Sequence, residues 1–256
     1  TLMRSSAASD VYKRQEYKVN VSLETPTVKV PEKEMRVLSL DEQRKLEIYL
    51  FSNLDLIAIG CLLSLYVGLR IGELSALKLS DFDFSNGTVK ITKTMQRVKN
   101  FDPEIKTKTK IIIDSPKSKK SVRTLPVPGF LLEIIKKRYG SVPPCAYFLT
   151  ASISRYKEPR RVEYQFKKIT DRCGLKEVNF HALRHTFATR LTEHGTDVKT
   201  LSELMGHANI KTTLKYMHSS EQQKRAVMNC FTYPLSRQNF GLCNKEFPEN
   251  KPVIAI

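Results

Sequence analysis

From residue 38 onward, the hydrophobic positions recur mostly at helical spacing. Ser39 and Glu42 stand three residues apart, as in a capping box, so a helix is predicted to begin there and to continue through DEQRKLEIYLF. The apolar stretch that follows is expected to form a helix that ends at Gly68. In all, the helices predicted after the first cover about Leu54 to Val67, Ile71 to Leu77, Phe130 to Tyr139, Arg161 to Cys173, Ala182 to His194, Val198 to Met205, Thr212 to Tyr216 and Ser220 to Asn229.

Between residues 88 and 128 the hydrophobic pattern changes. The runs TVKITKTM, KTKIIID and VRTLPVP are rich in β-branched residues and are separated by polar, basic turns. They predict one small antiparallel β-sheet inserted among the helices, so the expected fold class is mainly α with a small sheet, an α+β domain. Asp81 and Asp83 are expected to cap a turn, because Asn86 stands where a calcium-binding loop needs glycine.

The two ends of the chain lack this order. Residues 1–15 have no apolar periodicity, resemble a translated sequencing adapter, and are expected to be a non-native leader. Residues 16–36 are polar, contain Pro26 and Pro31, and are predicted to be a linker from an N-terminal domain that this chain lacks. The main domain is then expected over residues 37–218, followed by a tail over residues 219–256.

Composition narrows the class of partner. The chain of 256 residues has 43 Lys and Arg against 26 acidic residues, a net charge of +17. This excess favours a polyanionic partner, first of all nucleic acid, although a basic surface without a function is the alternative. No signal segment, membrane-length apolar run or basic amphipathic helix stands out, so an intracellular protein without a membrane partner is expected. Five scattered cysteines without a C-x-x-C pair predict reduced thiols.

Two segments in the first half of the domain place charge in informative positions. Arg70 stands between a glycine-terminated apolar helix and the next helix, with Glu73 three residues further on. Glu73 can orient the guanidinium from the same helix face, and an ordinary salt bridge explains the pair equally well. Residues 90–123 contain eleven Lys or Arg and three acidic residues, which form either a solvated face or a track for a DNA backbone.

Two segments in the second half supply His, Arg and Tyr. In HALRH, His181 and Arg184 share one helix face. A zinc site at His181 and His185 is not favoured, because Ala follows His181 where zinc proteases have Glu and because Arg184 would repel a metal. A packed core histidine is the alternative for each. LMGH places His207 nine residues before Tyr216, which alone is typical of a packed aromatic residue.

Together these segments match one family in order and spacing. The chain resembles the tyrosine recombinase (phage integrase) family, especially integrases of Gram-positive prophages and conjugative transposons. GLRIGEL, SPKSKKSVRTLPVP, HALRHTFAT and LMGHANIKTTLKYMH carry the resemblance, which covers roughly residues 37–218. It implies a catalytic domain that has lost its N-terminal core-binding domain. The implied function is a site-specific DNA recombinase, an integrase that cleaves and rejoins DNA through a 3′-phosphotyrosyl intermediate to integrate or excise a mobile element.

The resemblance also implies roles for individual residues. Tyr216 is the nucleophile, and His181 assists the loss of its proton. Lys117 matches the lysine of the β-hairpin and gives a proton to the leaving 5′ oxygen, although Lys119 and Lys120 lie close to it. The complete catalytic set is Arg70, Lys117, His181, Arg184, His207 and Tyr216, with Glu73 in support. The residues expected to bind DNA are Lys93, Lys106, Lys108, Lys119, Lys120 and Arg123.

The expected reaction needs neither a cofactor nor a metal, because the chain has no phosphate-binding G-x-x-x-x-G-K-[ST] loop and no dedicated carboxylate cluster. The expected partners are double-stranded DNA at attachment sites, three further copies in a homotetramer, and an accessory excision factor. The expected location is the bacterial cytoplasm, at the nucleoid when bound. Two alternatives stay open: a non-catalytic DNA-binding module of the same fold, and a type IB topoisomerase. The segments GLRIGEL and LMGH favour the recombinase over the topoisomerase.

Overall fold

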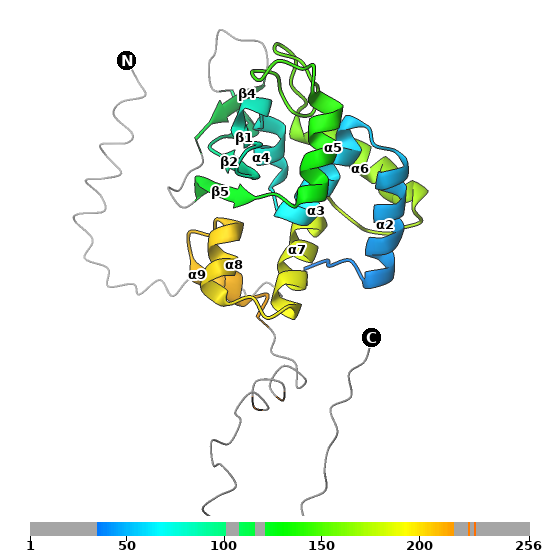
Figure 1. Cartoon of the computed structure of the whole chain (residues 1–256), viewed down its shortest axis with the longest axis vertical. Coiled ribbons are helices and arrows are strands. Elements are labelled where there is room, and N and C mark those ends of the chain that lie inside the picture. The colour runs from blue at the N-terminus through cyan, green and yellow to red at the C-terminus, as the bar shows by residue number, and fades with distance from the viewer. Residues whose placement is uncertain (1–34, 101–107, 116–120, 218–224, 226–227, 229–256) are drawn as a thin grey trace, which may run out of the picture. The chain divides into compact units, whose positions relative to one another are not determined.

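The computed structural model describes residues 35–100, 108–115, 121–217, 225 and 228. The chain divides into two units, residues 1–34 and 35–256, and all described residues belong to the second. Helices predominate and the strands are antiparallel, which confirms the predicted mainly α, α+β class (Figure 1). The helices are α2 (Leu40–Ser52), α3 (Leu56–Val67), α4 (Ile71–Ala76), η1 (Leu79–Asp81), α5 (Gly129–Tyr139), α6 (Pro159–Arg172), α7 (His181–Glu193), α8 (Val198–Met205) and α9 (Ile210–Leu214). The strands are β1 (Phe82–Asp83), β2 (Thr88–Ile91), β3 (Thr94–Lys99), β4 (Thr109–Asp114) and β5 (Arg123–Pro126).

Helix α2 begins with the predicted capping box. The Ser39 hydroxyl accepts a hydrogen bond from the backbone N–H of Glu42 at 3.2 Å, and the Glu42 carboxylate accepts one from the backbone N–H of Ser39 at 2.9 Å. Arg36 adds an ion pair to Glu42 at 2.5 Å. These contacts satisfy backbone donors that a helix start leaves free, and they set the direction in which Leu46 and Leu50 enter the core.

Helix α3 is the centre of the helical body. Nearly all its residues are buried, and it packs against α2, α5, α6 and α7. Asp55 caps it by accepting hydrogen bonds from the backbone N–H groups of Ile57 and Ala58. A helix that is apolar on every side suits this central position, because each fully buried aliphatic side chain contributes about 1.5–3 kcal/mol. Among the described residues, no helix is long and apolar enough to span a membrane.

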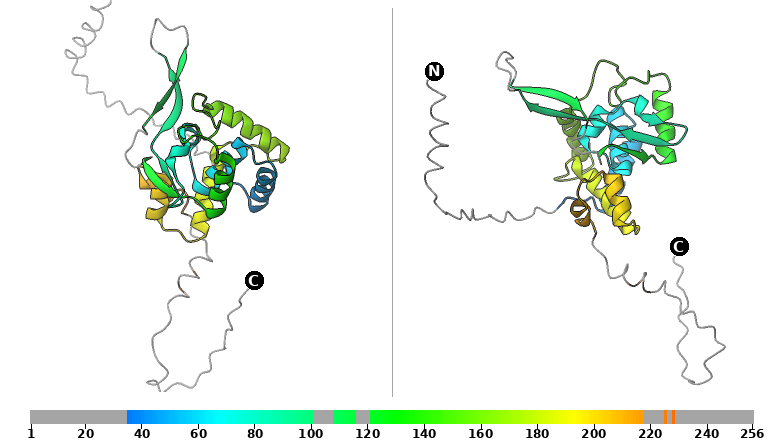
Figure 2. Two further views of the ribbon diagram at one scale, coloured as in Figure 1. Left: turned by 45° about the horizontal axis from the view of Figure 1, so that its top comes forward. Right: turned by 90° about the vertical axis from the view of Figure 1, so that its left-hand side faces the viewer.

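The strands form two small sheets, whereas the sequence predicted one. Strands β1, β2 and β5 form a three-stranded sheet, and β3 pairs with β4 in a separate two-stranded ribbon. In the first sheet the buried side chains of Val89 and Leu125 lie opposite each other. In the sequence, the β3–β4 ribbon thus lies between β2 and β5, which pair with each other. In space, the ribbon extends away from the helices (Figure 2). Strand β1 was not predicted, because a strand of two residues is too short to show an alternation of apolar and polar positions.

The two aspartates before β2 cap turns, as predicted. The Asp83 carboxylate accepts hydrogen bonds from the backbone N–H groups of Ser85 and Asn86 at 3.0 and 2.9 Å. The Asp81 carboxylate accepts one from the backbone N–H of Lys78 at 2.8 Å. The Asp83 contacts hold the turn between β1 and β2, and the Asp81 contact holds the connection from α4 to β1.

Helices α7, α8 and α9 form a smaller packing unit beside α3. Ala188, Leu201, Met205 and Tyr216 are its buried members. The predicted bounds of α7 and α8 agree with the structure to within one residue, but α9 ends at Leu214, so Tyr216 lies beyond the helix rather than in it. The predicted leader, most of the predicted linker, and the predicted helix over residues 220–229 (except 225 and 228) lie outside the described residues.

Candidate active site

Arg70 occupies the junction between α3 and α4. Gly68 ends α3 with a φ of 74°, a left-handed conformation that other residues adopt only at a cost. The chain then turns, so that Arg70 becomes the N-cap of α4. Glu73, in the first turn of α4, accepts hydrogen bonds from the backbone N–H of Arg70 at 2.9 Å and from its Nη1 at 2.8 Å. The predicted pairing of Arg70 with Glu73 is confirmed.

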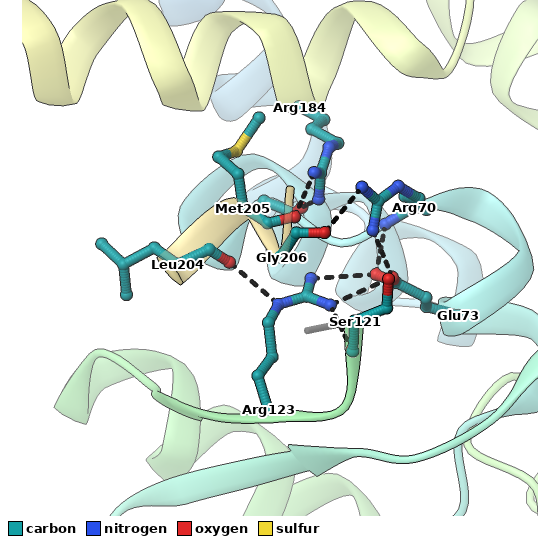
Figure 3. A network of polar contacts seen from close by, with 9 residues as sticks. Arg70, Glu73, Ser121, Arg123, Arg184, Leu204, Met205 and Gly206 are labelled. Atoms are coloured by element: carbon teal, nitrogen blue, oxygen red, sulfur yellow. Dashed lines mark hydrogen bonds and ion pairs between the residues drawn. The ribbon is translucent and has the colours of Figure 1, made fainter. Parts of the chain in front are cut away.

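A second guanidinium, from Arg123 at the start of β5, binds the same carboxylate. Its Nη1 and Nη2 donate to the two oxygens of Glu73 at 3.0 Å each, and its Nε donates to the carbonyl oxygen of Leu204 at 2.9 Å (Figure 3). Its side chain is only 6% exposed. The guanidinium of Arg123 faces protein oxygens and positions Glu73. Its predicted contact with DNA stays a prediction.

Arg184, on α7, is a buried cation with 1% of its surface exposed. It donates to the carbonyl oxygen of Gly68 at 2.5 Å and to that of Met205, while Arg70 donates to the carbonyl oxygen of Gly206 at 3.2 Å (Figure 3). Gly68 and Gly206 are the left-handed residues that end α3 and α8. Carbonyl groups at helix C-termini carry the negative end of the helix dipole, so the two helix ends hold the two arginines side by side.

The network is rich in positive charge. Within the part of the chain that the structure describes, three guanidinium groups surround the one carboxylate of Glu73, which binds two of them directly. Burial acts to raise the pKa of Glu73, but the hydrogen bond and charge of Arg123, with the charge of Arg70, outweigh it and lower the pKa to about 2. Burial and the charge of Arg70 lower the pKa of Arg184 to about 9, so it stays protonated at neutral pH. A site with this excess suits an anion with several oxygens.

Two histidines border the arginines. His207 lies just after α8 and is buried, with its Nδ1 2.9 Å from the hydroxyl oxygen of Thr213, so Nε2 is the nitrogen available to a substrate. His181 is the first residue of α7 and is exposed. Desolvation, together with the positive charges of Arg184 and Arg70, lowers the pKa of each histidine to about 4. Both rings are therefore neutral at pH 7. The described residues contain no His, Cys, Asp and Glu cluster that could hold a metal ion.

Tyr216 lies against the C-terminal part of this site. It is 7% exposed and packs with Ala188 and Met205. Its hydroxyl oxygen lies 2.6 Å from Nδ1 of His185. The ring of His207 is nearly parallel to that of Tyr216, with ring centroids 6.3 Å apart and an interplanar angle of 12°. The nucleophile candidate is therefore held between two histidines.

The state of the Tyr216 hydroxyl follows from its surroundings. Burial raises its pKa above the ordinary value of 10, and the positive charges of Arg184 and Arg70 offset part of this rise. The hydroxyl is therefore protonated at neutral pH, and it lies within the field of both arginines. The ring of His181, the residue predicted to assist proton loss, meets the ring of His185 edge-on, with centroids 4.4 Å apart. That role of His181 stays a prediction.

The structure brings most of the predicted catalytic side chains together. Lys117 lies outside the described residues, and the segment that contains it joins the β3–β4 ribbon to β5 of the other sheet. Lys93 and Lys108 are exposed beside the ribbon strands. The residues brought together are Arg70, Glu73, His181, Arg184, His207 and Tyr216. The other predicted DNA-binding residues outside the described part are Lys106, Lys119 and Lys120.

Sequence reasoning missed what His185 and Arg123 do. The i, i+4 spacing of His181 and His185 indicates two rings on one helix face. From the sequence, however, this pair was considered only as a possible zinc site. Which of the two meets Tyr216 depends on the path of the chain after α8. No local pattern marks Arg123 as buried, because its partner Glu73 is fifty residues away.

Comparison with known proteins supplies independent findings. Residues 39–223 match the model of the Phage integrase family. Tyrosine recombinase XerC-like of Caldanaerobacter subterraneus subsp. tengcongensis is 34% identical over 219 residues, which are 78% of this chain and 54% of that protein. Tyrosine recombinase XerA of Thermococcus onnurineus is 32% identical over 192 residues, 73% of this chain and 60% of that protein. The chain thus spans less than two thirds of the length of either relative.

A solved structure shares the fold. The Tn1549 transposon integrase in complex with circular intermediate DNA matches with a TM-score of 0.66 and 23% sequence identity. The match covers 90% of this chain and 78% of that one.

Proposed function

The chain belongs to the phage integrase family, and we propose that it is the catalytic part of a site-specific DNA recombinase that acts through Tyr216. One observation carries the proposal: the Tyr216 hydroxyl lies beside a network in which three guanidinium groups surround one carboxylate. A phosphodiester is an anion that such a site suits, and a phenol is a nucleophile that can attack it. The names of the two similar recombinases support the same conclusion.

The arginines account for stabilisation of the transition state. Attack on a phosphodiester increases the negative charge on the phosphoryl oxygens. Arg70 and Arg184 are already fixed by helix-end carbonyls, so their remaining N–H donors can meet that charge with little rearrangement. We assign a third donor to Nε2 of His207. Each such donor contributes on the order of 3 kcal/mol to catalysis.

The chemical step exchanges one phosphodiester for another. A bond forms between the Tyr216 oxygen and phosphorus while the bond from phosphorus to the 5′ oxygen breaks, leaving a 3′-phosphotyrosyl link and a free 5′ hydroxyl. The phenol loses a proton and the leaving oxygen gains one, which we assign to Lys117. His181, at the exposed end of the site, is proposed to assist the loss of the phenolic proton. Because the link retains the energy of a phosphodiester, a second DNA hydroxyl can reverse the step without nucleotide hydrolysis.

The proposed DNA track follows the β3–β4 ribbon. Lys93 and Lys108 are exposed beside its strands. Exposed lysines that contact backbone phosphates release counterions and therefore add affinity without reading sequence. Lys106, Lys119 and Lys120 complete the proposed track.

The proposed partners follow from the same function. We propose double-stranded DNA at attachment sites as substrate, a homotetramer as the active assembly and an accessory factor for excision. The task is integration or excision of a mobile element, in the bacterial cytoplasm and at the nucleoid when DNA is bound. The fold shared with a transposon integrase supports the mobile-element context.

The test is to trap the covalent link. The protein is incubated with a library of duplexes that carry a randomised segment and a single nick, and denaturation-resistant adducts are recovered and sequenced. We expect adducts enriched for one sequence, and none with Tyr216→Phe. Tyr164→Phe is the matched control, because Tyr164 is 61% exposed on α6.

Two other outcomes would support the rival functions. Binding of duplex DNA without any adduct would indicate a non-catalytic module of the same fold. Adducts at unselected sequences, together with relaxation of supercoiled plasmid, would indicate a type IB topoisomerase.

A further inference from the structure

We infer that His185 is a further catalytic residue, which accepts the proton of the Tyr216 hydroxyl as its oxygen attacks phosphorus. The inference deepens the proposed function and rests on it. It starts from the hydrogen bond of 2.6 Å between the Tyr216 hydroxyl and Nδ1 of His185. A proton acceptor must lie within about 2.6–3.2 Å of the atom that carries the proton, and His185 meets that requirement before any substrate is bound.

The position of His185 is fixed from several sides. It lies in the first half of α7, one turn after His181, whose ring meets it edge-on at a centroid distance of 4.4 Å. The ring of Tyr216 also lies near it, with centroids 5.7 Å apart. His185 is half-buried, so its imidazole is partly screened from water. Of the two histidines on this helix face, the one nearer the helix centre holds the nucleophile.

The surroundings keep His185 neutral, and in the tautomer that carries its proton on Nε2 the Nδ1 atom accepts the hydrogen bond from the Tyr216 hydroxyl. Desolvation and then the charge of the adjacent Arg184 lower the pKa of His185 below its ordinary value of about 6.5. The other titratable groups that face it are His181 and Tyr216. Helix α3, which packs on α7, has no acidic or basic residue in LIAIGCLLSLYV. On α8, the charged residues Lys199 and Glu203 are exposed.

The proton that His185 accepts is returned at the end of the reaction. The bond from the Tyr216 oxygen to phosphorus forms as the phenolic proton moves to Nδ1 of His185. The bond from phosphorus to the 5′ oxygen breaks, and that oxygen takes a proton from a separate donor, Lys117 in the proposed function. On rejoining, the protonated His185 returns its proton to the departing Tyr216 oxygen.

The test separates proton acceptance from hydrogen bonding. In His185→Asn, the amide oxygen replaces Nδ1 as an acceptor of the hydrogen bond but takes no proton. We expect single-turnover adduct formation to slow by about 10²-fold or more near pH 7. We also expect the rate of the variant to rise about tenfold per pH unit above neutrality, because the phenol must then ionise to water. His194→Asn is the matched control, an exposed histidine at the end of the same helix, and should match the wild type.

A DNA substrate with sulfur at the leaving 5′ position shows which of the two proton transfers a variant has lost. When sulfur replaces the leaving 5′ oxygen, the leaving group needs no proton. We expect this substrate to rescue Lys117→Ala but not His185→Asn. Rescue of His185→Asn, or a variant with the wild-type rate and pH profile, would overturn the inference. Wild-type protein that forms no adduct would instead contradict the proposed function.

A second measurement tests the hydrogen bond between His185 and Tyr216 directly, and it applies even if the variant does not fold or the wild type is inactive. The protein has five histidines, so ¹⁵N-histidine spectra of the wild type and Tyr216→Phe are readily compared. We expect the loss of the hydroxyl to move the Nδ1 resonance of one neutral histidine. Identical spectra would overturn the inference, because Nδ1 of His185 would then have no hydroxyl to accept from.

Discussion

At the scale of single residues, the site depends on one carboxylate. Glu73 is 2% exposed and binds Arg70 from its own helix and Arg123 from β5. Without it, two guanidinium groups would face each other in a largely buried space. Removing one partner from a buried ion pair costs about 3–5 kcal/mol, far more than a surface pair contributes. Glu73 therefore holds together both the fold and the cationic site.

Replacing Glu73 by glutamine should destabilise the protein in a pH-dependent way. The pKa of Glu73 is about 2 in the folded state against 4.5 ordinarily, which corresponds to about 3 kcal/mol. Because the folded pKa is lowered, this stabilisation is complete above pH 4.5 and is lost as the pH falls toward 2. Urea unfolding of wild type and Glu73→Gln from pH 7 to pH 2 should show their difference in free energy shrink over that window.

The control for this prediction is Glu193→Gln. Glu193 is 54% exposed and pairs with Arg190 on the surface of α7. Its loss should change the free energy of unfolding by less than about 1 kcal/mol. Equal effects of the two substitutions, or a Glu73→Gln difference that is the same at pH 7 and pH 2, would refute the role given to Glu73.

At the scale of elements, two helix ends make the site. Gly68 and Gly206 end α3 and α8 in the left-handed conformation and present carbonyl oxygens to Arg184 and Arg70. The helices themselves were predictable, because capping residues and helical periodicity are local signals. The division of the strands into two sheets was not, since pairing of β2 with β5 joins segments separated by the whole ribbon.

Substitution of Gly206 should test this helix end. A Cβ at residue 206 would lie 3.0 Å from Nη1 of Arg123, and φ there is +58°. We expect Gly206→Ala to lose about 1–2 kcal/mol of stability from backbone strain and to lose adduct formation as Arg123 is displaced. Thermal unfolding and adduct assays measure the two effects separately.

Gly195 offers the matched control. Its φ is +80°, and a Cβ there would meet nothing within 4 Å. Gly195→Ala should therefore lose a similar amount of stability and keep full adduct formation. If Gly206→Ala retained normal activity, the packing of Gly206 on Arg123 would not matter to the site.

At the scale of the whole molecule, the net charge is +17, and the basic residues behind it lie in two different environments. Arg70, Arg123 and Arg184 are engaged inside the site, whereas Lys93 and Lys108 are exposed beside the ribbon. Composition indicated a polyanionic partner but could not assign individual charges. Assignment needs tertiary contacts, as the burial of Arg123 shows.

The exposed lysines beside the ribbon should account for part of the salt dependence of DNA binding. Lys93→Gln with Lys108→Gln should weaken binding to any duplex and lower the slope of log K against log salt by about 0.9 for each phosphate that the protein no longer neutralises. Titration at several salt concentrations measures this slope. Lys137→Gln with Lys176→Gln removes the same charge from α5 and the α6–α7 connection. An equal effect of the control pair would mean that net charge alone, and no defined track, controls binding.

The most direct test is to identify the residue that becomes linked to DNA. The trapped adduct is digested with nuclease and trypsin, and the modified peptide is sequenced by mass spectrometry. We predict a nucleotide joined through its 3′ phosphate to the first residue of the peptide that follows Lys215, which is Tyr216. A nucleotide on any other residue, or attached through a 5′ phosphate, would contradict the proposed chemistry.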